Sequence, residues 1–249
     1  MISFPPDSFP TNLPASSIYP TPKYLQLGNL QEPVFDELVV LLAKLCRVPI
    51  AFISLIKAET VWFKHTIGWT GAERLPLDHT LCSLAMLQQT PTFFPDLLLE
   101  PCEQINSTEI EALGLRFYLG IPLRTRQGNM VGVLAILDQQ PRQPKVADYT
   151  LLEGFASLAS VLFDLYRAVA QPTHTSLLEN HQVYEAISQT MRCIHRLTER
   201  GGSTPSLKAS AAAEREVIAL EAHKLAYFIR HYLTLPYGSS PPSYEAFRS

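Results

Sequence analysis

The residues of this sequence with the most reactive side chains are four cysteines, at Cys46, Cys82, Cys102 and Cys193. No two of them form a C-x-x-C pair, and we expect free thiols in a reduced cytoplasm. Cys82 lies in the run DHTLCSLAMLQQ and is a candidate for oxidation or covalent attachment. A buried apolar thiol is unreactive unless its pKa is lowered, so a structural role is the alternative for Cys82.

Histidines beside this cysteine raise the question of a metal site. His65, His79 and Cys82 carry ligating atoms, but their spacing is not that of a metal motif. No carboxylate or histidine cluster completes four ligands, and we predict no metal.

Charged and aromatic side chains gather around the predicted strands. Asp96 follows one strand, and Arg116 and Arg124 flank another. The arginines could hold an anionic ligand or form a structural ion pair. About half of the aromatic side chains must face a core, and the others could line a small-molecule cavity. These aromatic residues are Trp62, Phe63, Phe93, Phe94, Phe117 and Tyr118.

The bulk composition is that of a globular protein. The chain has 249 residues, of which 47% are hydrophobic and 17% charged, and its net charge is −3. This length allows one core of ordinary size with chain left over, and the charge gives no basic field for nucleic acid or a membrane. Neither a signal peptide nor a run of about 18 uncharged apolar residues is recognisable. We therefore predict a cytoplasmic protein.

Apolar periodicity indicates how these residues are positioned. It predicts a helix over 32–47, strands over 49–57 and 60–68, and a loop over 68–77. A short helix over 78–89, which Asp78 or Thr80 could cap, and a strand over 90–96 follow. A second short helix is predicted from Thr108 to Gly114.

The stretch RFYLGIPLRTRQGNMVGVLAILD, residues 116–138, reads as two strands around a polar turn at 126–129. Its second strand shows no polar alternation, so we expect it to be covered on both faces and central in the sheet. Gly120 and Gly132 could each mark a bulge or a close approach.

Helices follow this hairpin. The segment 146–169 carries two apolar stripes, and a second subunit is a candidate partner for one of them, because its leucines, together with Phe155 and Val169, are spaced alternately by four and three. Those leucines are Leu151, Leu158, Leu162 and Leu165. A helical hairpin is predicted over 171–235, an irregular segment over 1–29 and a tail over 236–249.

The segments VPIAFISLIKAETVWFKHTIG, LCSLAM, FFPDLLLEP and LRFYLGIPLRTRQGNMVGVLAILDQQPR, in this order and spacing, resemble a GAF domain over residues 30–170. The likeness is to the N-terminal sensory GAF domains of bacterial histidine kinases and diguanylate cyclases. It implies an α+β fold with a central antiparallel sheet, helices on one face and a pocket on the other, here followed by the C-terminal helical hairpin.

The resemblance also implies a regulatory role, dimerisation through terminal helices and an unidentified small ligand. Its candidate pocket residues are Trp62, Phe63, Cys82, Phe94, Asp96, Arg116, Phe117 and Tyr118. Bilin-binding GAF domains usually have His after the anchoring cysteine, whereas Ser83 follows Cys82, so we predict no bilin and no other cofactor.

We therefore expect a non-enzymatic sensor of a small ligand or of redox state, which forms a homodimer and signals to a protein partner. Two alternatives stay open. One is a ligandless dimerisation scaffold whose pocket is filled by its own aromatic side chains. The other is a thiol enzyme similar to free methionine sulfoxide reductases, with Cys82 and Cys102 as nucleophilic and resolving cysteines.

Overall fold

The computed structural model describes residues 33–77, 80–99, 107–169, 181–200 and 208–234, together with Tyr244. The predictions for segment 1–29, for the tail apart from Tyr244, and for His79 and Cys102 lie outside these residues.

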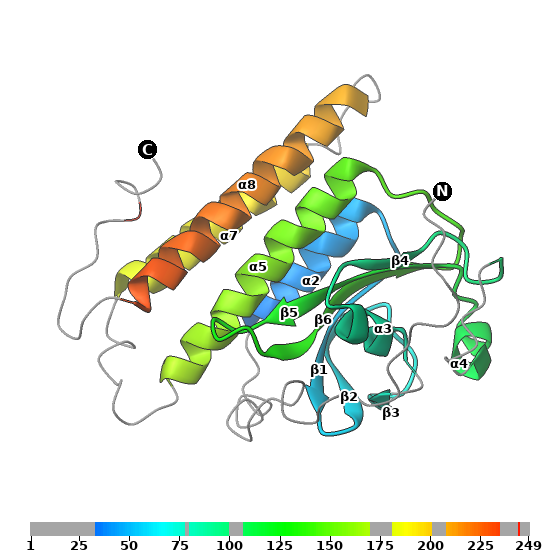
Figure 1. Cartoon of the computed structure of the whole chain (residues 1–249). Coiled ribbons are helices and arrows are strands. Elements are labelled where there is room, and N and C mark those ends of the chain that lie inside the picture. Colours follow the sequence, from blue (N-terminus) through cyan, green and yellow to red (C-terminus); the bar gives the residue numbers. More distant parts are fainter. Residues whose placement is uncertain are drawn as a thin grey trace.

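A six-stranded antiparallel sheet with strand order β3-β2-β1-β6-β5-β4 forms the centre of the molecule (Figure 1). Its strands are β1 (Ile50–Lys57), β2 (Thr60–Ile67), β3 (Arg74–Pro76), β4 (Thr92–Phe94), β5 (Phe117–Arg124) and β6 (Met130–Asp138). β6 pairs with both β1 and β5, and all of its residues are buried. The absence of polar alternation in β6 therefore predicted its central position correctly.

One prediction about this sheet is wrong. The segment 68–77 was expected to be a loop, but Arg74–Pro76 pairs with Thr60–Trp62 as the edge strand β3. A three-residue edge strand that contains Pro has no apolar pattern to announce it.

The two short helices agree with the sequence in position. α3 (Leu81–Gln88) begins after Thr80, although the Thr80 hydroxyl donates to Leu77 O at 3.1 Å instead of capping the helix. α4 (Ser107–Ala112) is followed by Gly114 with φ +62°, where glycine is favoured.

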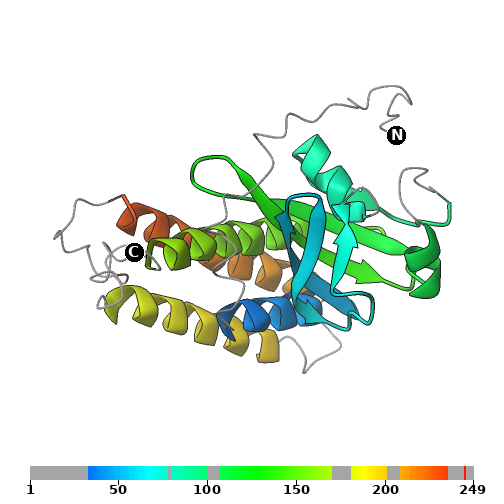
Figure 2. The same ribbon diagram turned by 90° about the horizontal axis from the view of Figure 1, so that it is seen from below.

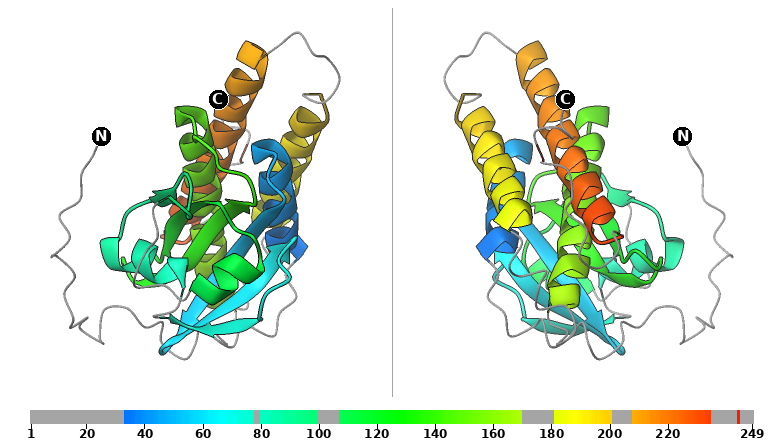
Figure 3. Two further views of the ribbon diagram at one scale, coloured as in Figure 1. Left: turned by 90° about the vertical axis from the view of Figure 1, so that its right-hand side faces the viewer. Right: turned by 90° about the vertical axis from the view of Figure 1, so that its left-hand side faces the viewer.

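In the part of the chain that the structure describes, four long helices lie on one face of the sheet. α2 (Pro33–Cys46) and α5 (Val146–Val169) pack on the strands, and α7 (His181–Arg200) and α8 (Lys208–Tyr232) fold back over them (Figure 3). The predicted helical hairpin thus packs against its own GAF-like sheet unit. The fold is α+β, as predicted.

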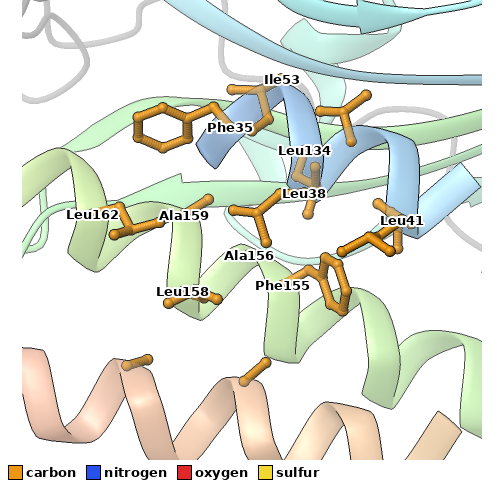
Figure 4. Close-up of a cluster of buried hydrophobic side chains, with 14 of the residues drawn as sticks. Phe35, Leu38, Leu41, Ile53, Leu134, Phe155, Ala156, Leu158, Ala159 and Leu162 are labelled. Atoms are coloured by element: carbon orange, nitrogen blue, oxygen red, sulfur yellow. The ribbon is translucent and has the colours of Figure 1, made fainter. Parts of the chain in front are cut away.

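The helix-side core joins all four long helices to the sheet. Figure 4 shows Leu158 pointing from α5 toward α8, while Leu38 and Ile53 lie among the side chains between helix and sheet. The contact of α5 with α8 is close, because a Cβ at Gly154 would lie 2.9 Å from Ala219 O.

The four α5 leucines are covered within one chain. Leu151, Leu158 and Leu162 are 0% exposed and Leu165 is 2% exposed, so α8 and the sheet already occupy both apolar stripes. A homodimer stays a prediction, but these leucines are not available to form it. Residues Val146–Ala168 are also long and apolar enough to cross a membrane by length and composition, and 67% of that window is buried inside the protein, as in a core helix.

Candidate functional site

The sheet face opposite the long helices carries a second apolar cluster, which we call the α3-side core. α3 covers this face, and Figure 2 shows α2 and α3 on opposite sides of the sheet. The cluster includes Phe52, Phe63, Leu81, Leu84, Met86, Val133 and Leu137. The predicted pocket would lie here, and the described residues of this face are packed against one another.

A small polar cluster lies inside the α3-side core. The Ser54 hydroxyl lies 3.6 Å from Cys82 Sγ and 3.3 Å from Val133 O, and can donate to either. Ser54, Cys82 and Tyr118 are each at most 1% exposed. Buried polar groups of this kind are expected to be hydrogen-bonded or to serve a function.

Tyr118 is the exception among them. Its hydroxyl oxygen has no hydrogen-bond partner of normal geometry among the described residues. Burial, and next the nearby Cys82 sulfur, raise the pKa of Tyr118 well above its ordinary value. The hydroxyl therefore stays protonated and offers both a donor and an acceptor to anything that enters this face.

The Cys82 thiol is chemically quiet in this environment. Burial raises the pKa of Cys82 to about 11, and the Ser54 hydrogen bond offsets only part of that rise. Because the thiolate is the reactive form, oxidation of Cys82 requires the α3-side core to open first. The structural alternative for this cysteine fits its burial.

Asp96 and Arg116 form an ion pair at the edge of the sheet. Arg116 Nε donates to Asp96 Oδ1 at 2.6 Å, and Nη2 pairs with Oδ2. The Leu98 N–H donates to the same carboxylate at 3.1 Å. The Arg116 hydrogen bonds lower the pKa of Asp96, which keeps the carboxylate charged. Because this carboxylate pairs with Arg116, it occupies the guanidinium that was predicted to hold an anionic ligand.

Arg124, the other arginine predicted to hold an anion, contacts the end of α3 instead. Arg124 Nη2 donates to Gln89 O at 2.7 Å, at the end of α3. Arg124 therefore ties β5 to the helix that covers the α3-side core.

The predicted pocket residues do not form one site. Phe63, Cys82 and Tyr118 lie in the α3-side core, with Phe94 packed at its margin. Phe117 belongs instead to the helix-side core.

Trp62 also lies away from the α3-side core. It is half-buried on β2 and is contacted by three cations, of which the Arg74 guanidinium lies 3.9 Å from the ring centroid. The sequence prediction missed Ser54, whose only signal is that it is the polar residue inside the apolar run IAFISLI.

The polar turn at 126–129 connects the sheet to the helices. The Arg126 N–H donates to Asp164 Oδ2 on α5 at 2.7 Å, and Arg126 Nη1 donates to Leu233 O at 2.9 Å. Arg167 Nη2 donates to Gln127 Oε1 at 3.3 Å. These hydrogen bonds join the β5–β6 turn to α5 and to the residue that follows α8.

Comparison with protein families decides the classification. The family model described as GAF domain matches residues 31–163. The chain belongs to the GAF domain family. The predicted resemblance is therefore confirmed, and the GAF domain spans the sheet, the short helices, α2 and most of α5.

A relative from Pseudomonas aeruginosa is named a cyclic di-GMP phosphodiesterase. It is 31% identical over 155 residues, which cover 59% of this GAF protein and 26% of the relative. The chain thus spans about a quarter of the length of that relative. The prediction that the protein is not an enzyme is wrong on this finding.

Solved structures share the fold. The blue-light absorbing form of the PixJ GAF domain from Thermosynechococcus elongatus has a TM-score of 0.50 at 15% identity, and the match covers 65% of this chain and 98% of that one. The GAF domain of a sensor histidine kinase from Bacillus halodurans has a TM-score of 0.49 at 19% identity, covering 57% and 99%.

Proposed function

We propose that this GAF protein is a sensory unit of cyclic di-GMP signalling, which binds a small ligand on the α3-side face and controls the turnover of cyclic di-GMP. The observation that carries the ligand part of this proposal is the buried Tyr118 hydroxyl beside Cys82 and Ser54, which has no hydrogen-bond partner of normal geometry among the described residues. The name of the P. aeruginosa relative supports the cyclic di-GMP part.

A ligand fits this face better than a redox signal does. Cys82 is buried and its pKa is raised, so an oxidant meets neither an accessible sulfur nor a thiolate. A ligand that displaces the Tyr118 ring would give its hydroxyl a partner and would find Ser54 and Cys82 below. The chemistry favours a compact, mostly apolar molecule with at least one hydrogen-bonding group.

The relay to the output would run through the β5–β6 hairpin. Tyr118 stands on β5, and the turn at the other end of that strand is bonded to Asp164 and Leu233. A shift of β5 would therefore change how α5 and α8 sit against each other. Such a relay needs a ligand that binds two arrangements with different affinity.

The scaffold alternative has an observation of its own. The Tyr118 ring itself fills the space over Gly120, as an internal side chain would in a GAF domain without a ligand. Native mass spectrometry of the full chain from its host separates the two possibilities. We expect a small mass that denaturation releases, and a protein that carries no extra mass would favour the scaffold.

The homodimer is also part of the proposal, and we place it on the outer face of α8. One row of outward-facing positions, all exposed except the half-buried Lys224, follows a four-three spacing, the pattern of a helix-pairing seam. The seam consists of Ala213, Val217, Leu220, Lys224, Tyr227 and His231. Val217, Leu220 and Tyr227 are 47%, 53% and 63% exposed, respectively.

The flanking charges favour an antiparallel pair with a second copy. Glu216 and Arg230 each precede a seam position, and an antiparallel arrangement places each opposite the other across the two-fold axis. Opposite charges at flanking positions fix partner and direction in paired helices. Dimerisation through α8 would leave the helix-side core intact.

The cyclic di-GMP role is tested in cells. We expect expression of the full chain to change the cyclic di-GMP level, measured by mass spectrometry, and Ser54→Ala to weaken that change. Thr66→Ala, at an exposed threonine of β2, is the matched control. An unchanged cyclic di-GMP level with the wild-type chain would contradict the role.

A further inference from the structure

A cavity of about 250 Å³ lies at the end of the helical layer, on the opposite side of the sheet from the α3-side core. Its walls come from the end of α2, from β5 and β6, and from the beginnings of α5 and α8. Pockets for drug-sized ligands measure about 300–1,000 Å³, so this one suits a compact molecule.

Cationic side chains dominate the walls of this cavity. Arg47, Arg142, Lys145 and Arg215 line it, and Asp148 is the acidic side chain among its lining residues. Cys46 lies among the same residues, and burial raises the pKa of its thiol to about 12, so it adds no negative charge. The cavity is thus electropositive.

The carboxylates at this cavity are already engaged. Arg142 pairs with Asp138 and donates to Cys46 O at 3.3 Å and to Arg47 O at 2.5 Å, which caps the end of α2. Asp148 Oδ1 accepts from Arg215 Nη1 at 2.5 Å, and Oδ2 accepts from the Lys145 N–H at 2.8 Å.

Donor groups, in contrast, are in surplus. The Arg215 guanidinium has five N–H donors, and one of them donates to a residue that the structure describes. The side chains of Arg47 and Lys145 make no hydrogen bond or ion pair with the residues that the structure describes, and both are exposed. A cavity with spare cationic donors and occupied carboxylates is complementary to an anion.

We infer that this cavity is a second binding site, for a compact anion that carries at least two phosphate or carboxylate groups, held between Arg47 and Lys145 on the GAF domain and Arg215 on α8. No residue of the α3-side core takes part. The inference therefore stands or falls independently of the function proposed above.

Isothermal titration calorimetry of the full chain tests the site with two probes, inorganic pyrophosphate and citrate, at matched ionic strength. We expect saturable binding of at least one probe with a stoichiometry of one. The probe that binds identifies whether phosphate or carboxylate groups are preferred. Absence of binding by both probes would overturn the inference.

Variants locate the binding. Lys145→Gln and Arg215→Gln should each raise the dissociation constant at least tenfold. Lys57→Gln changes an exposed lysine at the end of β1 and should leave the dissociation constant unchanged. Arg215→Gln also breaks the Asp148 pair, so the exposed Lys145 keeps the test decisive if that variant misfolds. Equal affinity of Lys145→Gln and the wild type would overturn the inference.

Discussion

The Tyr118 side chain lies over Gly120 on the same face of β5: a Cβ at Gly120 would come within 2.2 Å of the Tyr118 hydroxyl oxygen and 2.6 Å of Cζ. No real Cβ tolerates such a contact, so glycine is required for the ring to lie flat on the sheet. The sequence marked Gly120 as a possible close approach, and the partner is a side chain of its own strand.

Gly120→Ala should therefore destabilise the protein by about 1–3 kcal/mol, the usual cost of overpacking a core. Urea unfolding of the full chain measures this cost. The double variant Tyr118→Leu/Gly120→Ala should lose less than the sum of its two single variants, because leucine leaves room for the added methyl group. Strict additivity would mean that the ring does not lie on Gly120.

Tyr118→Phe removes a buried hydroxyl that has no partner of normal geometry within the described ranges. We expect this variant to be more stable than the wild type by about 1 kcal/mol, because an unsatisfied buried polar group costs free energy. The midpoint of urea unfolding reports the change. A loss of stability would instead assign the hydroxyl a real bond, with Cys82 Sγ as the candidate acceptor.

Asp164 should give the protein a pH dependence that opposes the usual acid denaturation. Burial raises the pKa of Asp164 above its ordinary value of 3.8, although the Arg126 N–H and nearby arginines oppose this rise. The folded state thus holds this proton more tightly than the unfolded state. The contribution to stability is greatest below pH 3.8 and is lost as the pH rises through the raised folded value.

Asp164→Asn isolates this effect, because the amide oxygen can still accept from the Arg126 N–H. We expect the stability of the variant relative to the wild type to increase with pH across that window, measured by urea unfolding at several pH values. Glu153→Gln, on the exposed side of α5, is the charge-matched control. Parallel pH profiles for Asp164→Asn and the wild type would contradict the prediction.

The sequence could place the strands of the GAF domain but not the facing of their side chains. Trp62 and Phe63 are neighbours on one strand, as are Phe117 and Tyr118, so only one member of each pair can face the α3 side. The choice depends on register, and an irregularity between Ile53 and Ser54 shifts the register of β1 against β2. No local pattern encodes that shift.

The partner of the α5 leucines was undetermined for a related reason. A four-three spacing fits any helix that packs along α5, whether it comes from the same chain or from a second copy. Here α8 of the same chain provides it, with Gly154 set against Ala219. The hydrogen bonds of Arg126 to Asp164 and Leu233 also span large sequence separations, so no local pattern could indicate them.

A homodimer formed through the α8 seam should be disrupted by a single charge added to that seam. Leu220 is 53% exposed at the centre of the seam, where an antiparallel partner would bring Lys224 of the second copy beside it. Leu220→Lys would then place cations next to cations in a closing interface. We expect its dimer dissociation constant to rise at least tenfold, about 1.4 kcal/mol, in light scattering coupled to size exclusion.

Leu99→Lys provides the matched control, because Leu99 is 79% exposed and lies outside α8. The direction of the pair is read by disulfide cross-linking of Val217→Cys mixed with Tyr227→Cys. An antiparallel pair joins these two variants to each other, whereas a parallel pair joins each to itself. An unchanged dimer in Leu220→Lys would move the interface away from α8, and its loss in Leu99→Lys as well would mean that added charge alone disrupts association.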